Sequence, residues 1–131
     1  MDQDQALAAR IVYLASPYTH ALPAIRLARF EAATQAAARL VETGRIVYSP
    51  LTMTHPIDLV LAQEGETLGS DYWVRFDEAF MEFCSEMVVL RLSGWQLSSG
   101  IAREMEFFRR RGRPISFIDP DGIHVHDVAL P

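Results

Sequence analysis

The sequence predicts a single α/β domain, with a mostly parallel sheet of four or five strands and helices on both faces. Two observations support this prediction. Short apolar runs rich in β-forming residues recur along the chain, and stretches with a helical apolar period separate them. The length of 131 residues suits one domain with its own core. Since 50% of the residues are hydrophobic and 22% are charged, the composition is that of an ordinary globular protein.

Apolar runs typical of strands occur at residues 11–15, 46–48, 87–92, 115–118 and 123–128. Helical apolar periods occur at residues 22–43, 71–85 and 100–111. Because strands that alternate with helices favour a parallel sheet, we expect a flavodoxin-like or Rossmann-like layout. Residues 51–70 have the least regular pattern, and we expect a lid or side wall there with a short helix after Pro56.

Charge and composition argue against several classes of function. The net charge of -5 is unfavourable for a nucleic-acid polymer as the main ligand. The single cysteine, Cys84, excludes an internal disulfide and a multi-cysteine zinc site. No apolar run approaches the roughly 20 residues that cross a bilayer, and the N-terminus lacks a signal-peptide core, so we expect a cytoplasmic protein without a membrane partner. The histidines are not spaced as metal ligands beside a carboxylate cluster, so we expect no metal, and we expect no cofactor.

The chain is organised around residues 90–108. An apolar run ends there in a loop of small polar residues, and a helix begins near Gly100. A helix start of this kind presents free backbone N–H groups and a positive dipole end to an anion. Glu104 lies about one turn into the helix and faces inward, whereas Arg103 is expected on the far face. An inward carboxylate at the edge of an apolar surface needs either a partner or a function.

The helix expected at residues 71–85 contributes a second inward carboxylate. Its apolar stripe consists of Trp73, Phe76, Phe80, Phe83 and Cys84. Asp77 falls within that stripe, whereas the other acidic residues in the interior of this helix fall on the opposite side. We expect the pKa of Asp77 to be raised, because its surroundings are apolar and another carboxylate lies nearby.

The loops that follow parallel strands share one edge of the sheet, where α/β proteins bind ligands. Two carboxylates in different environments suit displacement at an anomeric carbon, since one can attack while the other handles the proton of the leaving group. Aromatic side chains such as Tyr13, Tyr18 and Trp95 suit a flat ring such as a nucleobase. For each carboxylate taken alone, a structural role stays open, in which Asp77 caps backbone groups and Glu104 pairs with an arginine.

Residues 13–18, 48–50 and 100–104, together with Asp77, resemble the nucleoside 2-deoxyribosyltransferase superfamily, and its small bacterial and phage branch in particular. The likeness extends over nearly the whole chain and implies one such domain over residues 1–131. It implies that Glu104 attacks C1′ of the sugar to form a covalent glycosyl-enzyme, that Asp77 assists departure of the base, and that Tyr13 positions the nucleophile or the sugar. The candidate substrate contacts are Ser16, Pro17, Tyr18, His55, Trp95, Ser98 and Gly100.

The chain also departs from that superfamily. The transferases carry acidic residues just before the glycine, where this chain has Ser98 and Ser99. Members that hydrolyse nucleoside 5′-monophosphates carry a serine there that contacts the phosphate, so Ser98 favours a phosphorylated nucleotide. Those hydrolases also have a glycine-rich first loop with an arginine, and residues 16–20 have neither. Arg29 or a residue of a partner chain is the expected substitute, although a snorkelling or ion-paired side chain is the simpler interpretation of Arg29.

We therefore expect an enzyme that cleaves or transfers the N-glycosidic bond of a nucleoside or a nucleoside 5′-monophosphate. The alternative is a non-catalytic nucleotide-binding sensor or interaction module. Glu104 favours the enzyme, because a binder of an anionic nucleotide gains nothing from a second anion near the sugar. Apolar helix positions away from the core, such as Phe107, favour a homodimer or a larger homo-oligomer, as the resemblance also implies.

Overall fold

The computed structural model describes residues 10–122. They form a four-stranded parallel sheet in the order β2-β1-β3-β4. Its strands are β1 (Ile11–Ala15), β2 (Ile46–Tyr48), β3 (Glu86–Leu90) and β4 (Ile115–Ile118). The expected parallel α/β fold is therefore confirmed. The strand expected at residues 123–128, with His124 and His126, lies outside the described residues.

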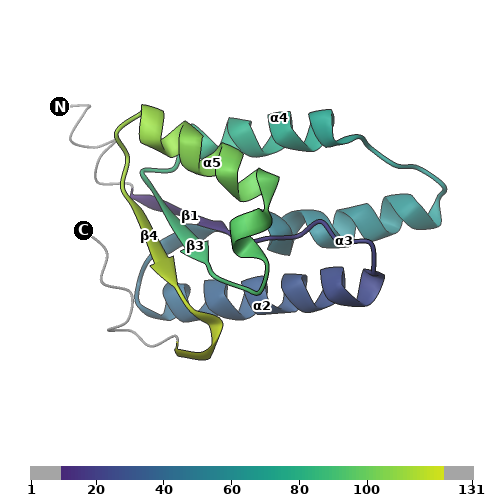
Figure 1. Ribbon diagram of the computed structural model, residues 1–131, viewed down its shortest axis with the longest axis horizontal. Helices are drawn as coiled ribbons and strands as arrows, with labels where there is room; N and C mark the ends of the chain where they lie inside the picture. The colour runs from purple at the N-terminus through teal and green to yellow at the C-terminus, as the bar shows by residue number, and fades with distance from the viewer. Residues whose placement is uncertain (1–9, 123–131) are drawn as a thin grey trace.

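Helices lie on both faces of this sheet. They are α2 (Pro23–Glu42), α3 (Pro50–Gln63), α4 (Ser70–Met81) and α5 (Ser99–Arg110). Figure 1 shows α4 and α5 along one face and α2 along the other, with α3 packed against α2. Within the described part of the chain, no helix is both long and apolar enough to span a bilayer.

The central strands β1 and β3 separate two hydrophobic cores because alternate residues of a strand face opposite sides. On the side of α4 and α5, the buried core residues are Tyr13, Ala15, Met81, Cys84, Met87, Val89, Ile101 and Phe108. On the side of α2, they are Val12, Leu14, Ala36, Leu40, Val88, Leu90 and Ile118. All five residues of β3 are buried, which explains why this strand is apolar over almost its whole length.

The irregular structure expected for residues 51–70 was wrong, whereas the expected side wall is confirmed, because Leu51, Thr54 and Asp58 line the cavity described below. Residues 50–63 form the 14-residue helix α3, and only residues 64–69 connect it to α4. Its apolar side chains surround the helix instead of forming one stripe, because Met53, Leu59 and Val60 are all exposed. Pro56 lies inside the helix, where its missing N–H removes one helical hydrogen bond. The lack of an apolar stripe and the internal proline concealed this helix in the sequence.

The helix predicted at residues 71–85 ends four residues earlier, since α4 stops at Met81. Phe83 follows that end and is 76% exposed, so it does not belong to the apolar stripe that the sequence indicated. Cys84, one residue further on, is buried as expected. The helical period persisted in the sequence beyond the point at which the backbone turns toward β3.

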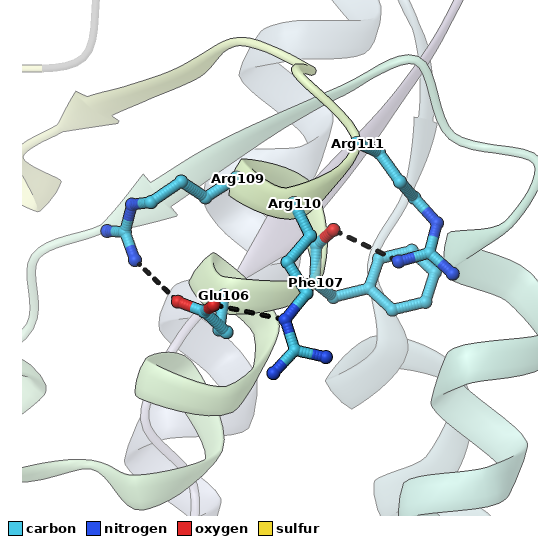
Figure 2. A network of polar contacts seen from close by, with 5 residues as sticks. All are labelled: Glu106, Phe107, Arg109, Arg110 and Arg111. Atoms are coloured by element: carbon cyan, nitrogen blue, oxygen red, sulfur yellow. Dashed lines mark hydrogen bonds and ion pairs between the residues drawn. The ribbon is translucent and has the colours of Figure 1, made fainter.

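Phe107 of α5 is not an open apolar site. Its ring packs partly against the core, and the guanidinium carbon of Arg111 lies 3.5 Å from the ring centroid (Figure 2). The same turn of helix holds Glu106, which pairs with both Arg109 and Arg110 at 3.0 and 3.1 Å. These cations at the C-terminal end of α5 also complement the helix dipole. Glu106 therefore offsets one of the two positive charges of Arg109 and Arg110.

Candidate functional site

A cavity of about 890 Å³ opens where β1 and β3 end. The strand order reverses direction between these two strands, which is the position where doubly wound sheets bind ligands. The volume lies within the range of small-molecule sites. Seven of the predicted site residues line the cavity: Ser16, Pro17, Tyr18, Asp77, Ser98, Gly100 and Glu104. The sequence therefore predicted correctly that residues from three separate segments lie at one cavity.

Tyr13 supports Glu104 from beneath the cavity. The Tyr13 hydroxyl donates a hydrogen bond to Oε2 of Glu104 at 2.8 Å. Tyr13 is fully buried in β1, and its ring packs between Tyr48 and Phe108 with centroid distances of 6.0 and 5.7 Å. Because the hydroxyl comes from the centre of the sheet, it fixes the carboxylate relative to the rigid core. The contact gives Tyr13 the geometry to position Glu104, and its role in a reaction stays a prediction.

Burial raises the pKa of Glu104 to about 8. The hydrogen bond from Tyr13 lowers this pKa, the charge of Asp77 raises it, and the guanidinium of Arg103 lowers it. The pKa of Tyr13 is also raised well above its usual value, first by burial and then by the charges of Glu104 and Asp77. The Tyr13 hydroxyl therefore stays protonated and acts as a donor to Glu104.

Asp77 reaches the same cavity from α4. Its Oδ1 atom is buried and has no hydrogen-bond partner among the described residues. Burial raises the pKa of Asp77 to about 6, and Arg103 opposes this shift. The predicted inward position is confirmed, and burial alone raises the pKa, without the contribution that was expected from a second carboxylate. An unpaired carboxyl oxygen that faces a cavity is available to a ligand, because leaving it buried without a partner is unfavourable.

Ser98 begins the helix that carries Glu104. It is the N-cap of α5, and its Oγ accepts a hydrogen bond from the backbone N–H of Ile101 at 3.1 Å. Ser99 and Gly100 form the first turn and line the cavity with Ser98. The positive end of the helix dipole is therefore directed at the cavity, as the sequence indicated. The cap gives Ser98 a structural role whether or not it also contacts a ligand.

His55 and Trp95 lie behind the wall instead of lining it. His55 is only 3% exposed, its Nδ1 lies 2.6 Å from the Tyr18 hydroxyl, and its ring stacks on Phe30. Trp95 packs against Phe117 and the core beneath α5. Neither belongs to the residues that line the cavity. The prediction that these two residues contact the substrate was therefore wrong. Both support the cavity wall from behind, and His55 does so by holding Tyr18.

Two cationic wall residues were not identified from the sequence. Arg103 projects from the outer side of α5, but its side chain reaches the cavity over the start of the helix, because helical side chains lean toward the N-terminus. Arg26 lines the cavity from α2 and donates to the carbonyl of His20. Its spacing of three residues from Arg29 places both on one side of α2, and that spacing was an available signal.

The fold and the cavity define a parallel α/β domain with a carboxylate-bearing crevice at its topological switch point. Among the described residues, no group of three or more His, Cys, Asp or Glu side chains gathers into a possible metal site. The chain belongs to the family named Domain of unknown function (DUF1937), whose sequence model matches residues 10–119. A search of curated proteins found no match to the chain.

Proposed function

We propose that this protein cleaves, or transfers, the N-glycosidic bond of a nucleoside or a nucleoside 5′-monophosphate. The observation that supports this proposal best is the 2.8 Å hydrogen bond from the buried Tyr13 to Glu104 at the cavity wall that also holds Asp77. It orients one carboxylate toward the cavity and leaves the second free to exchange a proton. This is the set of groups that displacement at an anomeric carbon requires.

In the proposed first step, an oxygen of ionised Glu104 forms a bond to C1′ of the sugar. The bond between C1′ and the base nitrogen breaks, and its electron pair stays with the base. The departing base takes a proton from Asp77, whose raised pKa of about 6 keeps part of the population protonated near neutral pH. The result is a glycosyl ester on Glu104 and a free base.

In the second step, a water molecule attacks C1′ and Asp77 takes its proton. The ester bond breaks, Glu104 recovers its electron pair as a carboxylate, and the sugar leaves with its original configuration at C1′. If a second base attacks instead of water, the same step gives transfer. The two reactions differ only in the acceptor, so the carboxylates serve both.

Cationic groups near the helix start support a 5′-monophosphate as the substrate. Arg26, Arg29 and Arg103 all line the cavity. Within residues 10–122, Arg103 forms no hydrogen bond or ion pair with the protein, so its guanidinium can neutralise a phosphate near Ser99 and Gly100. A partner chain is then not required for this charge. Tyr18 and Trp73, which also line the cavity, supply aromatic surface for the base.

The test is a panel of nucleosides and nucleoside 5′-monophosphates, with ribose and 2′-deoxyribose forms, analysed for free base. Wild-type protein should release base, and Glu104→Gln should lower the rate by about 10³-fold or more, because the nucleophile is lost. Glu106→Gln removes a carboxylate from the opposite side of α5 and should leave turnover unchanged. Equal rates for the wild type and Glu104→Gln would refute the assignment.

One observation favours the non-catalytic alternative. The pKa of Glu104, at about 8, leaves most of the unliganded protein with a neutral carboxyl at pH 7. A neutral Glu104 can bind a nucleotide as a hydrogen-bond donor without attacking it. In that case calorimetry would detect binding of panel members that are never cleaved, and intact-mass analysis would show no glycosyl adduct on the protein.

A further inference from the structure

Arg29 connects the two loops that bound the cavity. Its Nη1 donates to the carbonyl of Thr19 at 3.0 Å, and its Nη2 donates to the carbonyl of Ser93 at 3.2 Å. Thr19 belongs to the loop after β1, and Ser93 belongs to the loop after β3. These loops leave the sheet at neighbouring strands, on either side of the switch point. One guanidinium on α2 therefore joins both edges of the crevice.

Gly94 gives the guanidinium its space. A Cβ atom at this position would lie 3.2 Å from Nη2 of Arg29, which is closer than most such contacts. The backbone of Gly94 also has φ of +90°, in the left-handed region that favours glycine. Gly44 has the same φ of +90° but no atom within 4 Å of its Cβ position. Alanine substitutions at Gly44 and Gly94 therefore both carry the free-energy cost of the left-handed backbone, but only the substitution at Gly94 also crowds Arg29.

We propose that Arg29 is a positioning residue that sets the width of the crevice by bridging the carbonyls of Thr19 and Ser93. The guanidinium is a planar group with donors at fixed angles, so it can hold two carbonyls at a defined separation. A lysine at this position carries the charge but has a single, flexible ammonium group. This inference replaces the interpretation of Arg29 as a snorkelling or ion-paired side chain.

The bridge is independent of the carboxylates. Glu104 is held by Tyr13 from the sheet and by the capped start of α5, and neither contact involves Arg29. Loss of the bridge should therefore loosen residues 16–22 and 91–95, which precede the Ser98 cap, while Glu104 keeps its position and its pKa. The kinetic consequence rests on the proposed function, whereas the consequences for stability and backbone protection do not.

The first experiment is a double-mutant cycle measured by thermal unfolding of the full chain. We expect Gly94→Ala to lower the Tm more than Gly44→Ala does, because it adds crowding at Arg29 to the cost of the left-handed conformation. In an Arg29→Ala background, the effect of Gly94→Ala should shrink to that of Gly44→Ala. An unchanged difference between the two glycines in that background would overturn the proposal.

The second experiment compares Arg29→Ala with Arg29→Lys in hydrogen exchange. Both variants should lose protection at the amides of Leu92 and Trp95, whose hydrogen bonds lie in the loop after β3, with no change in β3 itself. Recovery of protection in Arg29→Lys would show that charge alone matters, and it would overturn the proposal. This result stands even if no panel substrate is cleaved, so it is separate from the test of the proposed function.

If the panel identifies a substrate, comparing the changes in KM and in kcat completes the test. A wider crevice should raise KM roughly tenfold in both Arg29 variants, comparable to losing one hydrogen bond to a charged group. The value of kcat and its pH profile should not change, because Glu104 and Asp77 stay in place. A lower kcat at unchanged KM would indicate a smaller active fraction and would refute the positioning role, as would full rescue by Arg29→Lys.

Discussion

The two ends of the cavity are held by different parts of the protein. At the carboxylate end, Glu104 is fixed by Tyr13, whose ring is fully buried in the central strand β1. At the loop end, the walls are tied through Arg29, which bonds to main-chain carbonyls near the surface. Burial makes the first arrangement rigid and perturbs its pKa values, while solvent leaves the second adjustable. The protein thus places the groups proposed to react on its core and the groups proposed to select the ligand on its loops.

Asp77→Asn should give the largest difference between an effect on turnover, at the carboxylate end, and an effect on binding, at the loop end. Loss of the proton donor should reduce turnover by about 10²-fold, and most strongly for bases that leave poorly without protonation. Binding, which depends on the loop end, should change little. Asp71→Asn is the matched control, because Asp71 lies in the first turn of the same helix and also lines the cavity. Steady-state kinetics on both variants would decide, and equal losses would contradict the comparison.

The pH dependence of turnover provides a second criterion. With pKa values near 6 for Asp77 and 8 for Glu104, the rate should follow a bell whose limbs lie near those values. The limbs belong to the carboxyl pair, because two interacting acids titrate together. The active form has an ionised Glu104 and a protonated Asp77, so it is a minor species at every pH. In Asp77→Asn the alkaline limb should disappear, because only the ionisation of Glu104 remains and the rate should rise through its pKa to a plateau.

Tyr13→Phe should have a smaller effect at the same end. It removes the hydroxyl that lowers the pKa of Glu104, so this pKa should rise and less carboxylate should be ionised at neutral pH. We expect turnover at pH 7 to fall by about tenfold, as one hydrogen bond to a charged group is lost, with a shift of the profile to higher pH. Tyr48→Phe is the control, since Tyr48 packs against the Tyr13 ring while its hydroxyl donates to the sulfur of Met53. An unchanged profile in Tyr13→Phe would contradict the positioning role of this hydroxyl.

Stability should also respond to pH through Glu104. Its pKa is raised in the folded protein from the usual 4.5 to about 8, so the folded state holds the proton more tightly than the unfolded state. The stabilisation is complete below pH 4.5 and is lost as the pH rises through 8. Urea unfolding at pH 9 should show Glu104→Gln more stable than wild type by on the order of 2 kcal/mol, with little difference at pH 5. A wild type that is as stable at pH 9 as Glu104→Gln would show that the carboxyl is not perturbed.

The smallest expected effect concerns assembly. We propose a homodimer or a larger homo-oligomer, as the apolar surface and the resemblance suggested. With Phe107 covered by Arg111, exposed apolar side chains remain on several elements, among them Val60 on α3 and Phe83 just after α4. Phe83→Ser and Val60→Ser should weaken association without affecting the carboxylates. Light scattering at micromolar concentration would test this, and a wild type of 14.8 kDa would rule out the assembly.

The sequence was most informative where a side chain breaks a strong local pattern. Glu104 and Asp77 are acidic residues on apolar helix faces, and the structure places both at one cavity. The sequence was least informative where tertiary packing decides which side chains line the cavity. Arg103 reaches the cavity from an outward helix position, and His55 is separated from it by Tyr18. The helix α3 was concealed because its apolar residues follow no stripe. Periodicity predicts which face is buried, but it does not predict how far a long side chain reaches.

The parallel pairing of β1 has a further consequence for folding. Tyr13 faces α5 because it alternates with Val12 and Leu14, and its register partner in β3 is Met87. A slip by one residue would turn the Tyr13 hydroxyl toward α2 and bring an aliphatic side chain beneath Glu104. Such a chain could keep most of its secondary structure and yet have no hydroxyl at the carboxylate. Correct alignment of β1 and β3 is therefore a condition for assembling the site. A chain with a register error could fold and still lack the proposed activity.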